Sequence, residues 1–267
     1  MSGLRNYSFI SLSRKDFEKD NQDLFEKIKQ AETVLNLAGS PILKRWTRKT
    51  KKAICASRIE PTRKLADAIG MMDHDVHLLS ASAIGIYDNM NIHHEDSREY
   101  SEGFIRELLD EWEKEAMKIS NGRHQVTILR IGLVISGRGG ILKYLWPVFK
   151  MGFGGTLGNG KQMMSFIHID DLISAIDFII RKEIYGIVNL TAPAPVTNRE
   201  FTKIFSAILR KPAFLKIPGF ILKLMFGKGA DIILSGQHVH PGVLLGKGFI
   251  FKYPDIRSAL KNAIESS

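Results

Sequence analysis

Short, nearly all-apolar segments recur along this chain, and helix-like stretches separate them. Five such segments have the length and composition of strands: 7–12, 33–38, 76–82, 126–135 and 186–190. Strands that are apolar on both faces and alternate with helices are typical of a parallel sheet covered on both sides. The pattern therefore predicts an α/β fold with a doubly wound parallel sheet.

The segments between the strands have helical spacing or helix-capping residues. We expect helices over 16–30, 47–69 and 104–119, with a kink or a break at Pro61 in the second. Asp170 or Asp171 is predicted to cap a helix that ends near residue 182. Thr197 and Glu200 fit a capping box, which predicts a helix from there to about residue 210.

The chain is long enough for one large domain with a smaller one attached. From about residue 211 the alternation gives way to short apolar pieces broken by Pro and Gly. We therefore predict domains over 1–210 and 211–267. Residues 217–226 are apolar enough to suggest membrane contact, but Lys223 interrupts them, so a short helix docked on the domain is the favoured interpretation.

The net charge of +10 raises the question of nucleic-acid binding. The densest basic stretch is 44–52, and no zinc-ligand spacing, RNP-like motif or helix-turn-helix accompanies it. A solvated helix near an anionic ligand is the favoured interpretation, and no nucleic-acid partner is expected. The histidines at 93 and 94 do not match a metal-site spacing, so no metal is expected.

The single cysteine, Cys55, excludes an intramolecular disulfide and suits a reducing compartment. No apolar run approaches the roughly 20 residues of a membrane span, and the first residues lack a signal-peptide core. A cytoplasmic protein without membrane contact is predicted.

In a parallel sheet of this kind, ligands bind beyond the carboxyl ends of the strands. Arg14 follows the first expected strand. An arginine at this place can bind the 2′-phosphate of a dinucleotide, and a solvent-exposed arginine on a loop is an equal alternative. The residues 36–39 and 80–82 follow the next two strands. Small side chains there allow close approach of a flat ligand, and a serine hydroxyl can contact a carbonyl or a sugar.

Several long motifs of the chain resemble those of a known protein family. They are VLNLAGSPILKRWT (34–47), LLSASAIGIY (78–87), ILRIGLVIS (128–136), GFGGTLGNGKQMMSFIHIDDL (152–172) and GIVNLTAPAPVTNREF (186–201). With the tail 211–260, they resemble the extended short-chain dehydrogenase/reductase superfamily, and within it the NAD(P)-dependent epimerase family of the cell-division-inhibitor-like type. The resemblance implies a Rossmann-type fold, NADP as cofactor and a small, sugar-like substrate.

The resemblance also assigns site residues. It implies that Ser82 is the catalytic hydroxyl and that Gln162, Phe166 and His168 lie on the substrate side. For His168, a strand end before a helix N-cap is the favoured alternative to an acid/base role. The cofactor would be held by residues from four strand ends, namely Ser13, Arg14, Asn36, Leu37, Ala38, Gly39, Ser80, Ala81, Arg130, Ile131, Gly132 and Leu133.

Two departures from the family pattern matter. The helix over 104–119 lacks the Tyr-x-x-x-Lys pair that carries the proton in the superfamily. Tyr87 is the nearest substitute, although a packing role is favoured for it. The chain also begins at what resembles the second strand, so roughly twenty residues with the glycine-rich pyrophosphate turn are expected to be missing. A misplaced start codon, a truncated product and a partner that completes the sheet are the open explanations, and the first two are favoured.

Two hypotheses of different classes follow from these features. The first is an NADP-linked oxidoreductase or epimerase-like protein, supported by the residues 36–39 and 80–82. The second is a non-catalytic binding or regulatory protein that uses a degenerate nucleotide pocket, favoured by the two departures.

A first prediction concerns cofactor affinity. Without the glycine-rich turn, the pyrophosphate loses backbone N–H donors and a helix dipole. The 267-residue chain is therefore expected to bind NADP weakly or not at all in calorimetry. Micromolar binding would show this expectation to be wrong.

Overall fold

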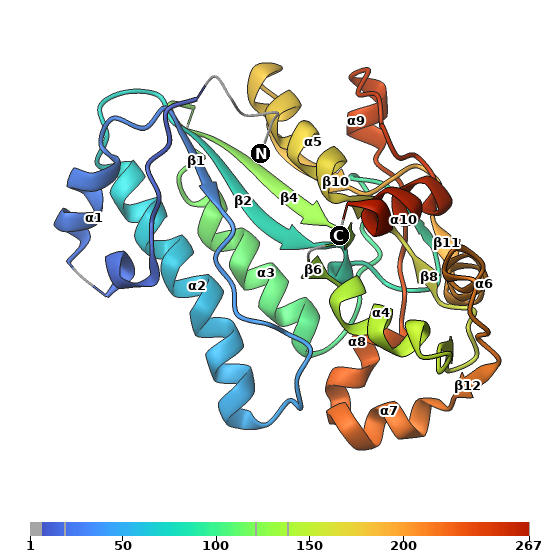
Figure 1. The fold of residues 1–267 in the computed structure, drawn as a ribbon. Coiled ribbons are helices and arrows are strands. Elements are labelled where there is room, and N and C mark those ends of the chain that lie inside the picture. The colour runs from blue at the N-terminus through green and yellow to red at the C-terminus, as the bar shows by residue number, and fades with distance from the viewer. Residues whose placement is uncertain (1–6, 19, 121, 138, 267) are drawn as a thin grey trace.

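The structure, a computed structural model, describes residues 7–18, 20–120, 122–137 and 139–266. Its main sheet has four parallel strands in the order β1–β2–β4–β10 (Figure 1). These are β1 (Thr33–Asn36), β2 (His77–Ala83), β4 (Gln125–Ile131) and β10 (Gly186–Leu190). The predicted α/β class with a Rossmann-type parallel sheet is confirmed.

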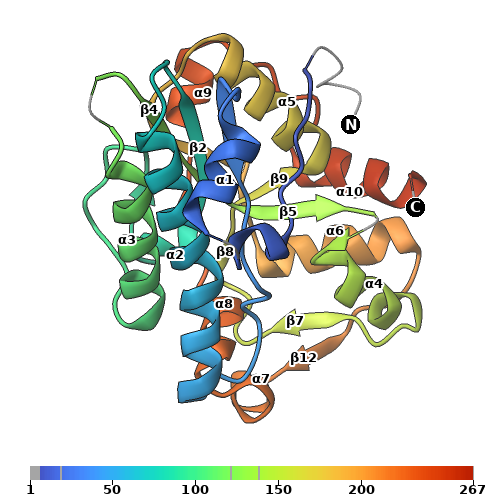
Figure 2. The same ribbon diagram turned by 90° about the vertical axis from the view of Figure 1, so that its left-hand side faces the viewer.

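Successive residues of these strands point to opposite faces of the sheet, and both faces are covered. Leu78 and Ile128 belong to one core cluster, with residues of α1 (Asn21–Ile28) and α2 (Arg48–Gly70). Leu79 and Leu129 belong to another, with residues of α5 (Ile169–Arg181). α3 (Phe104–Met117) packs beside α2, and Figure 2 shows these two helices across the strands from α5.

The expected strand over 126–135 divides at Gly132. β4 ends at Ile131, and β5 (Leu133–Ser136) joins a second sheet with β6 (Gly139–Gly140) and β9 (Phe166–His168). A Cβ at Gly132 would lie 2.6 Å from the Ser165 carbonyl oxygen and 2.9 Å from Thr191 Cγ2. The chain therefore changes sheets at a point where only glycine fits without displacing its neighbours.

Two helix predictions need correction. α2 begins after its N-cap Thr47 and continues through Pro61, so the helix does not break there, and the kink given as the alternative stays a prediction. Neither Asp170 nor Asp171 caps α5, because His168 is the N-cap and its Nδ1 accepts a hydrogen bond from the Asp170 amide. The Asp171 carboxylate instead accepts the amides of Lys252 and Tyr253, at 2.8 and 2.9 Å.

The prediction of a strand over residues 7–12 was also wrong. Residues 7–12 form no strand, and β1 pairs only with β2 among the described residues. An isolated apolar segment becomes a strand only with a ladder partner. Leu12 packs on the core instead, and the Tyr7 hydroxyl donates to Asp177 of α5. The expected helix over 16–30 consists of a 3₁₀ turn, η2 (Arg14–Phe17), and α1 with Asp20 as its N-cap.

Most of the remaining elements form a lobe at one end of the main sheet (Figure 1). Between β2 and β10 they are η3 (Ile84–Ile86), β3 (Ile92–His93), α4 (Leu142–Lys150), β7 (Gly155–Leu157) and β8 (Met163–Met164). After β10 they are β11 (Val196–Thr197), α6 (Asn198–Leu209), β12 (Leu215–Ile217), α7 (Gly219–Phe226), η4 (Gly227–Ala230), α8 (Asp231–Leu234), β13 (His238–Val239), α9 (Gly242–Gly246) and α10 (Ile256–Glu265). The capping box of Thr197 and Glu200 that opens α6 is confirmed.

The C-terminal part of the chain is connected to the rest by strand pairs and a shared core. β12 pairs with β7, β13 pairs with β3, and α10 packs against α6 and β5. Ile256 and Leu260 of α10 belong to the same core cluster as Phe166, Phe201 and Phe205. The division at residue 210 stays a prediction.

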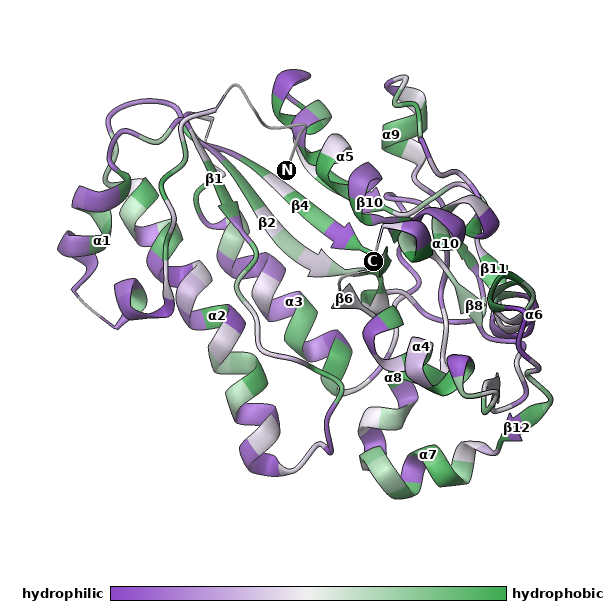
Figure 3. Ribbon diagram, viewed as in Figure 1, coloured by the Kyte–Doolittle hydropathy of each residue, from purple (hydrophilic) through white to green (hydrophobic). Residues whose placement is uncertain are grey.

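The distribution of apolar residues agrees with the packing of helices on the sheet. Figure 3 shows apolar residues along the strands and on the helix sides that face them, and also over much of α7. Within the described part of the chain, no helix combines the length and apolar character needed to cross a membrane.

The contact at Gly132 gives a stability prediction. Gly132→Ala should lower the free energy of unfolding by about 1–3 kcal/mol, because the Ser165 carbonyl cannot move away without disturbing β5 and β9. Gly70→Ala is the control, since a Cβ there meets no atom within 4 Å. Urea unfolding measures both, and equal midpoints for the two variants would contradict the close-approach argument.

Candidate active site

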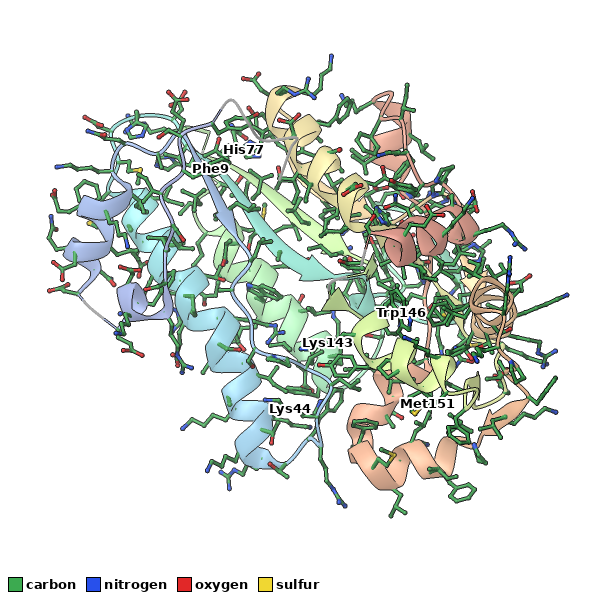
Figure 4. All side chains as sticks on the ribbon, in the orientation of Figure 1. Phe9, Lys44, His77, Lys143, Trp146 and Met151 are labelled. Carbon is green, nitrogen blue, oxygen red and sulfur yellow. The ribbon has the colours of Figure 1, made fainter. Side chains whose placement is uncertain are left out.

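The structure brings the ends of β1, β2 and β4 together at one edge of the main sheet. Asn36 lies beside Ser80, and Ser82 lies beside Arg130, in the strand register. In Figure 4, Lys44 and Lys143 lie toward this carboxyl edge, whereas His77 lies at the amino ends of the strands. The predicted residues of these three strands are thus neighbours, as the parallel-sheet argument requires.

A buried ion pair lies at the centre of this edge. Arg130 is 2% exposed, and its Nε and Nη2 donate to the two carboxylate oxygens of Glu113 at 3.0 and 2.8 Å. The Ser82 hydroxyl donates to the same carboxylate at 2.5 Å. Burial acts to lower the pKa of Arg130, but the hydrogen bonds and charge of Glu113 outweigh it and raise that pKa above its ordinary value.

Glu113 is the functional candidate that sequence reasoning missed. It lies on α3, the helix in which the superfamily's Tyr-x-x-x-Lys pair was sought, and its carboxylate reaches Ser82. The stretch EWEKEA (111–116) gave no sign of this contact, because neighbouring acidic side chains on a helix usually face water. Only the packing of α3 against β2 and β4 distinguishes Glu113 from them.

Asn36 organises the turn after β1. Its amide nitrogen donates to the Thr62 hydroxyl at 2.7 Å, and its side-chain oxygen accepts the Ala38 amide at 3.1 Å. The Thr62 oxygen also accepts the Trp112 indole N–H at 2.8 Å. The turn with Leu37, Ala38 and Gly39 is therefore fixed by side chains from α2 and α3.

Arg58 of α2 is a second candidate that the sequence did not single out. Its guanidinium carbon lies 3.0 Å from the position of a Cβ on Gly39, and its Nη2 donates to the Ser40 carbonyl at 2.9 Å. Burial lowers its pKa, and no carboxylate pairs with it among the described contacts. A partly buried cation beside a small-residue turn fits the phosphate of a dinucleotide.

Tyr87 is held by packing on every side that the structure describes. Its hydroxyl donates to Asn189 Oδ1 at 3.0 Å, and its ring stacks on His93 with centroids 4.7 Å apart. The Arg130 guanidinium carbon lies 4.9 Å from the ring centre. Burial raises the pKa of Tyr87, so its phenol stays protonated at neutral pH.

The other residues predicted to bind the cofactor lie in three different parts of the fold. Ser13 is the N-cap of η2 and donates to the Asp16 carboxylate, and Arg14 is the first residue of η2, with its 95% exposed side chain 3.9 Å from Glu18. Because no strand precedes them, the strand-end argument for these two residues no longer applies. Ser80 and Ala81 are buried within β2, while Gly132 and Leu133 lie where β4 gives way to β5.

The three predicted substrate residues make internal contacts. Gln162 donates to the carbonyls of Leu157 and Ile233, and Phe166 is fully buried in the cluster with Phe201. The His168 ring lies 4.0 Å from that of Tyr253, and burial lowers its pKa. Their substrate roles stay predictions.

Two pockets lie away from this edge. One, of about 370 Å³, is at the amino ends of the strands and includes His77, whose pKa burial lowers to about 4. The other, of about 270 Å³, is beside α6 and includes Arg199. Across the described residues, no group of three or more His, Cys, Asp or Glu side chains is arranged to hold a metal ion.

The parallel sheet and its clustered carboxyl edge define a dinucleotide-binding class of fold. The chain belongs to the NAD dependent epimerase/dehydratase family, whose signature matches residues 8–191. Residues 217–263 match a domain of unknown function, DUF1731. This agrees with the resemblance stated from the motifs and with a small C-terminal domain.

The more particular similarity is to proteins of the SDR39U1 type. The Arabidopsis thaliana "Epimerase family protein SDR39U1 homolog, chloroplastic" is 38% identical over 85% of this chain and 67% of its own length. An epimerase family protein of Staphylococcus epidermidis is 35% identical over 97% of this chain and 86% of its own. The crystal structure of human SDR39U1 (isoform 2) with NADPH is similar with a TM-score of 0.86 and 28% identity, covering 91% of this chain and 86% of that one.

The ion pair gives the prediction for this site. Arg130→Met leaves a partly buried carboxylate without its cation and should lower the free energy of unfolding by about 3–5 kcal/mol. The double variant Arg130→Met/Glu113→Leu should recover part of that loss, because no lone charge is left. Arg14→Met, which removes an exposed pair, is the control and should leave the urea midpoint unchanged. An Arg130 variant as stable as this control would refute the role given to the pair.

Proposed function

We propose that this chain is an NADP(H)-linked oxidoreductase or epimerase-like protein that acts on a small, sugar-like substrate at the carboxyl edge of β1, β2 and β4. Family membership and the NADPH in the human relative's structure support the class of cofactor. The observation that carries the proposal is the hydrogen bond from Ser82 Oγ to the Glu113 carboxylate.

Residues from two elements would hold the cofactor. Arg58 provides a cation for a phosphate, and the fixed turn of Asn36, Ala38 and Gly39 provides a small, rigid surface for the adenosine side. When bound, the nicotinamide would supply the hydride acceptor or donor. The Nη1 of Arg130 is buried without a hydrogen-bond partner, so it is a donor still to be satisfied at the same edge.

The proton path follows from the direction of the hydrogen bonds. The Ser82 hydroxyl donates its proton to Glu113, so its oxygen accepts a hydrogen bond from a substrate hydroxyl. When hydride leaves the substrate carbon, the hydroxyl proton passes to Ser82 Oγ and the serine proton passes to Glu113. The substrate C–O bond becomes a carbonyl, and Arg130 keeps the carboxylate oriented throughout.

A second candidate function is a non-catalytic binding or regulatory protein that uses the same edge. α3, which is described in full, has no Tyr-x-x-x-Lys pair. Its carboxylate at the site, Glu113, is already engaged by Arg130. This protein would keep the nucleotide surface and lack turnover.

The test follows reduced-cofactor absorbance with oxidised NADP and a panel of sugars and sugar nucleotides. Ser82→Ala and Glu113→Gln should each slow any turnover by about 10²–10⁴-fold, because both interrupt the proton path. Ser206→Ala, which alters a half-buried serine on α6, is the matched control and should leave the rate unchanged.

Ligand-observed NMR with millimolar NADPH separates the two candidates. The proposed enzyme should show both binding and turnover, with binding little changed in the Ser82 variant. Binding without turnover on any member of the panel selects the non-catalytic candidate. The absence of both agrees with the affinity expected without the glycine-rich turn and rejects both candidates for this 267-residue chain.

A further inference from the structure

α7 presents its apolar side to solvent. Phe220, Leu224 and Met225 are 71%, 73% and 61% exposed, and Leu222 is the buried residue of this helix. Phe214, just before β12, is 89% exposed. We call Phe214, Phe220, Ile221, Leu224 and Met225 the α7 face.

The helical period explains why these side chains share a side. Residues 220, 221, 224 and 225 are spaced one, three and four apart and cover one broad stripe, whereas Leu222 points the other way into the lobe. A surface helix normally buries such a stripe. An exposed apolar patch of large side chains marks an interaction surface. The helix predicted over 217–226 therefore exists, but its docking leaves most of its apolar side uncovered by described residues.

The chain segment that carries this face is basic. Residues 201–230 contain six basic side chains and no acidic one, between Glu200 and Asp231. All six are exposed and take part in none of the ion pairs between described residues, namely Lys203, Arg210, Lys211, Lys216, Lys223 and Lys228. More than half of the net charge of +10 thus lies in this one stretch.

A basic pocket adjoins the same face. The pocket of about 270 Å³ beside α6 is lined by Thr156, Gly158, Asn159, Arg199 and Lys216, without a carboxylate. The side chain of Leu234 lies 3.0 Å from a Cβ position on Gly158 and 3.3 Å from one on Gly219, the first residue of α7. One leucine therefore connects the pocket to the start of the apolar helix. Two cations without an acidic neighbour in the lining suit a phosphate group.

We propose that the α7 face and its basic surroundings dock on an anionic phospholipid surface. The apolar side chains would enter the interface, the lysines would lie at headgroup level, and Arg199 with Lys216 would contact a lipid phosphate. A second copy of the chain is disfavoured as the occupant, because it would bring the same positive charge against this one. The proposal departs from the expectation of no membrane contact and does not depend on the proposed catalytic function.

Co-sedimentation with lipid vesicles tests the proposal. The purified chain should sediment with vesicles of phosphatidylcholine and phosphatidylserine, bind those of phosphatidylcholine alone much less, and be released by salt. Phe220→Ser/Leu224→Ser should lower the partition coefficient about tenfold or more. Arg199→Ser/Lys216→Ser should lower binding to the anionic vesicles only.

The control removes two apolar side chains elsewhere that are at least as exposed as Phe220 and Leu224. Met90 and Ile250 are 84% and 88% exposed, and Met90→Ser/Ile250→Ser should leave vesicle binding unchanged. Thermal unfolding curves check that all variants are folded. Failure to bind anionic vesicles, or an equal loss in the control, overturns the proposal. So does a dimer in light scattering that the α7 variant dissociates, since it would make a second copy the occupant.

Discussion

The bidentate pair between Arg130 and Glu113 holds the centre of the candidate site together. A guanidinium that is 2% exposed is tolerated only with a carboxylate at hydrogen-bonding distance. This requirement fixes α3 against β4, and because Ser82 donates to the same carboxylate, it also fixes the end of β2. The elements α3, β4 and β2, which are separate in the sequence, thus contact one another through the Glu113 carboxylate. The hydrogen bond to this carboxylate also orients the Ser82 hydroxyl, the candidate catalytic group.

Gly132 sets the second constraint, because it connects the main sheet to the lobe. The chain leaves the four-stranded sheet there and enters the sheet of β5 and β9 within one residue. The lobe is then closed by long-range contacts: Asp171 accepts two amides of the C-terminal segment, and β12 and β13 pair with β7 and β3. Closure places the candidate site beside the lobe and leaves α7 at its outer side (Figure 1). The proposed chemical and docking functions therefore occupy different surfaces of the same fold.

Much of the architecture was predictable because it depends on local pattern. Apolar runs bounded by turns predicted β1, β2, β4 and β10 to within a few residues, and the capping box predicted the start of α6. The same local signals gave wrong predictions where contacts with residues distant in the sequence determine the secondary structure. The apolar segment 7–12 has strand composition but no ladder partner, and β4 and β5 look continuous until Ser165 and Thr191 crowd Gly132. Pro61 was given too much weight, since one missing N–H did not interrupt a helix of 23 residues.

For the candidate site, the parallel-sheet rule placed Asn36 and Ser82 at strand ends on one edge, and the family resemblance added Arg130 to the same site. The tertiary structure decided what those residues contact. Glu113 among several acidic residues of α3, and Arg58 among many bases of α2, became candidates only when packing turned them toward the strand ends. It also decided that the apolar side of α7 faces outward. The local sequence pattern determines which residues lie at the end of a strand. The burial and the hydrogen-bond partners of those residues depend on elements that are distant in the sequence.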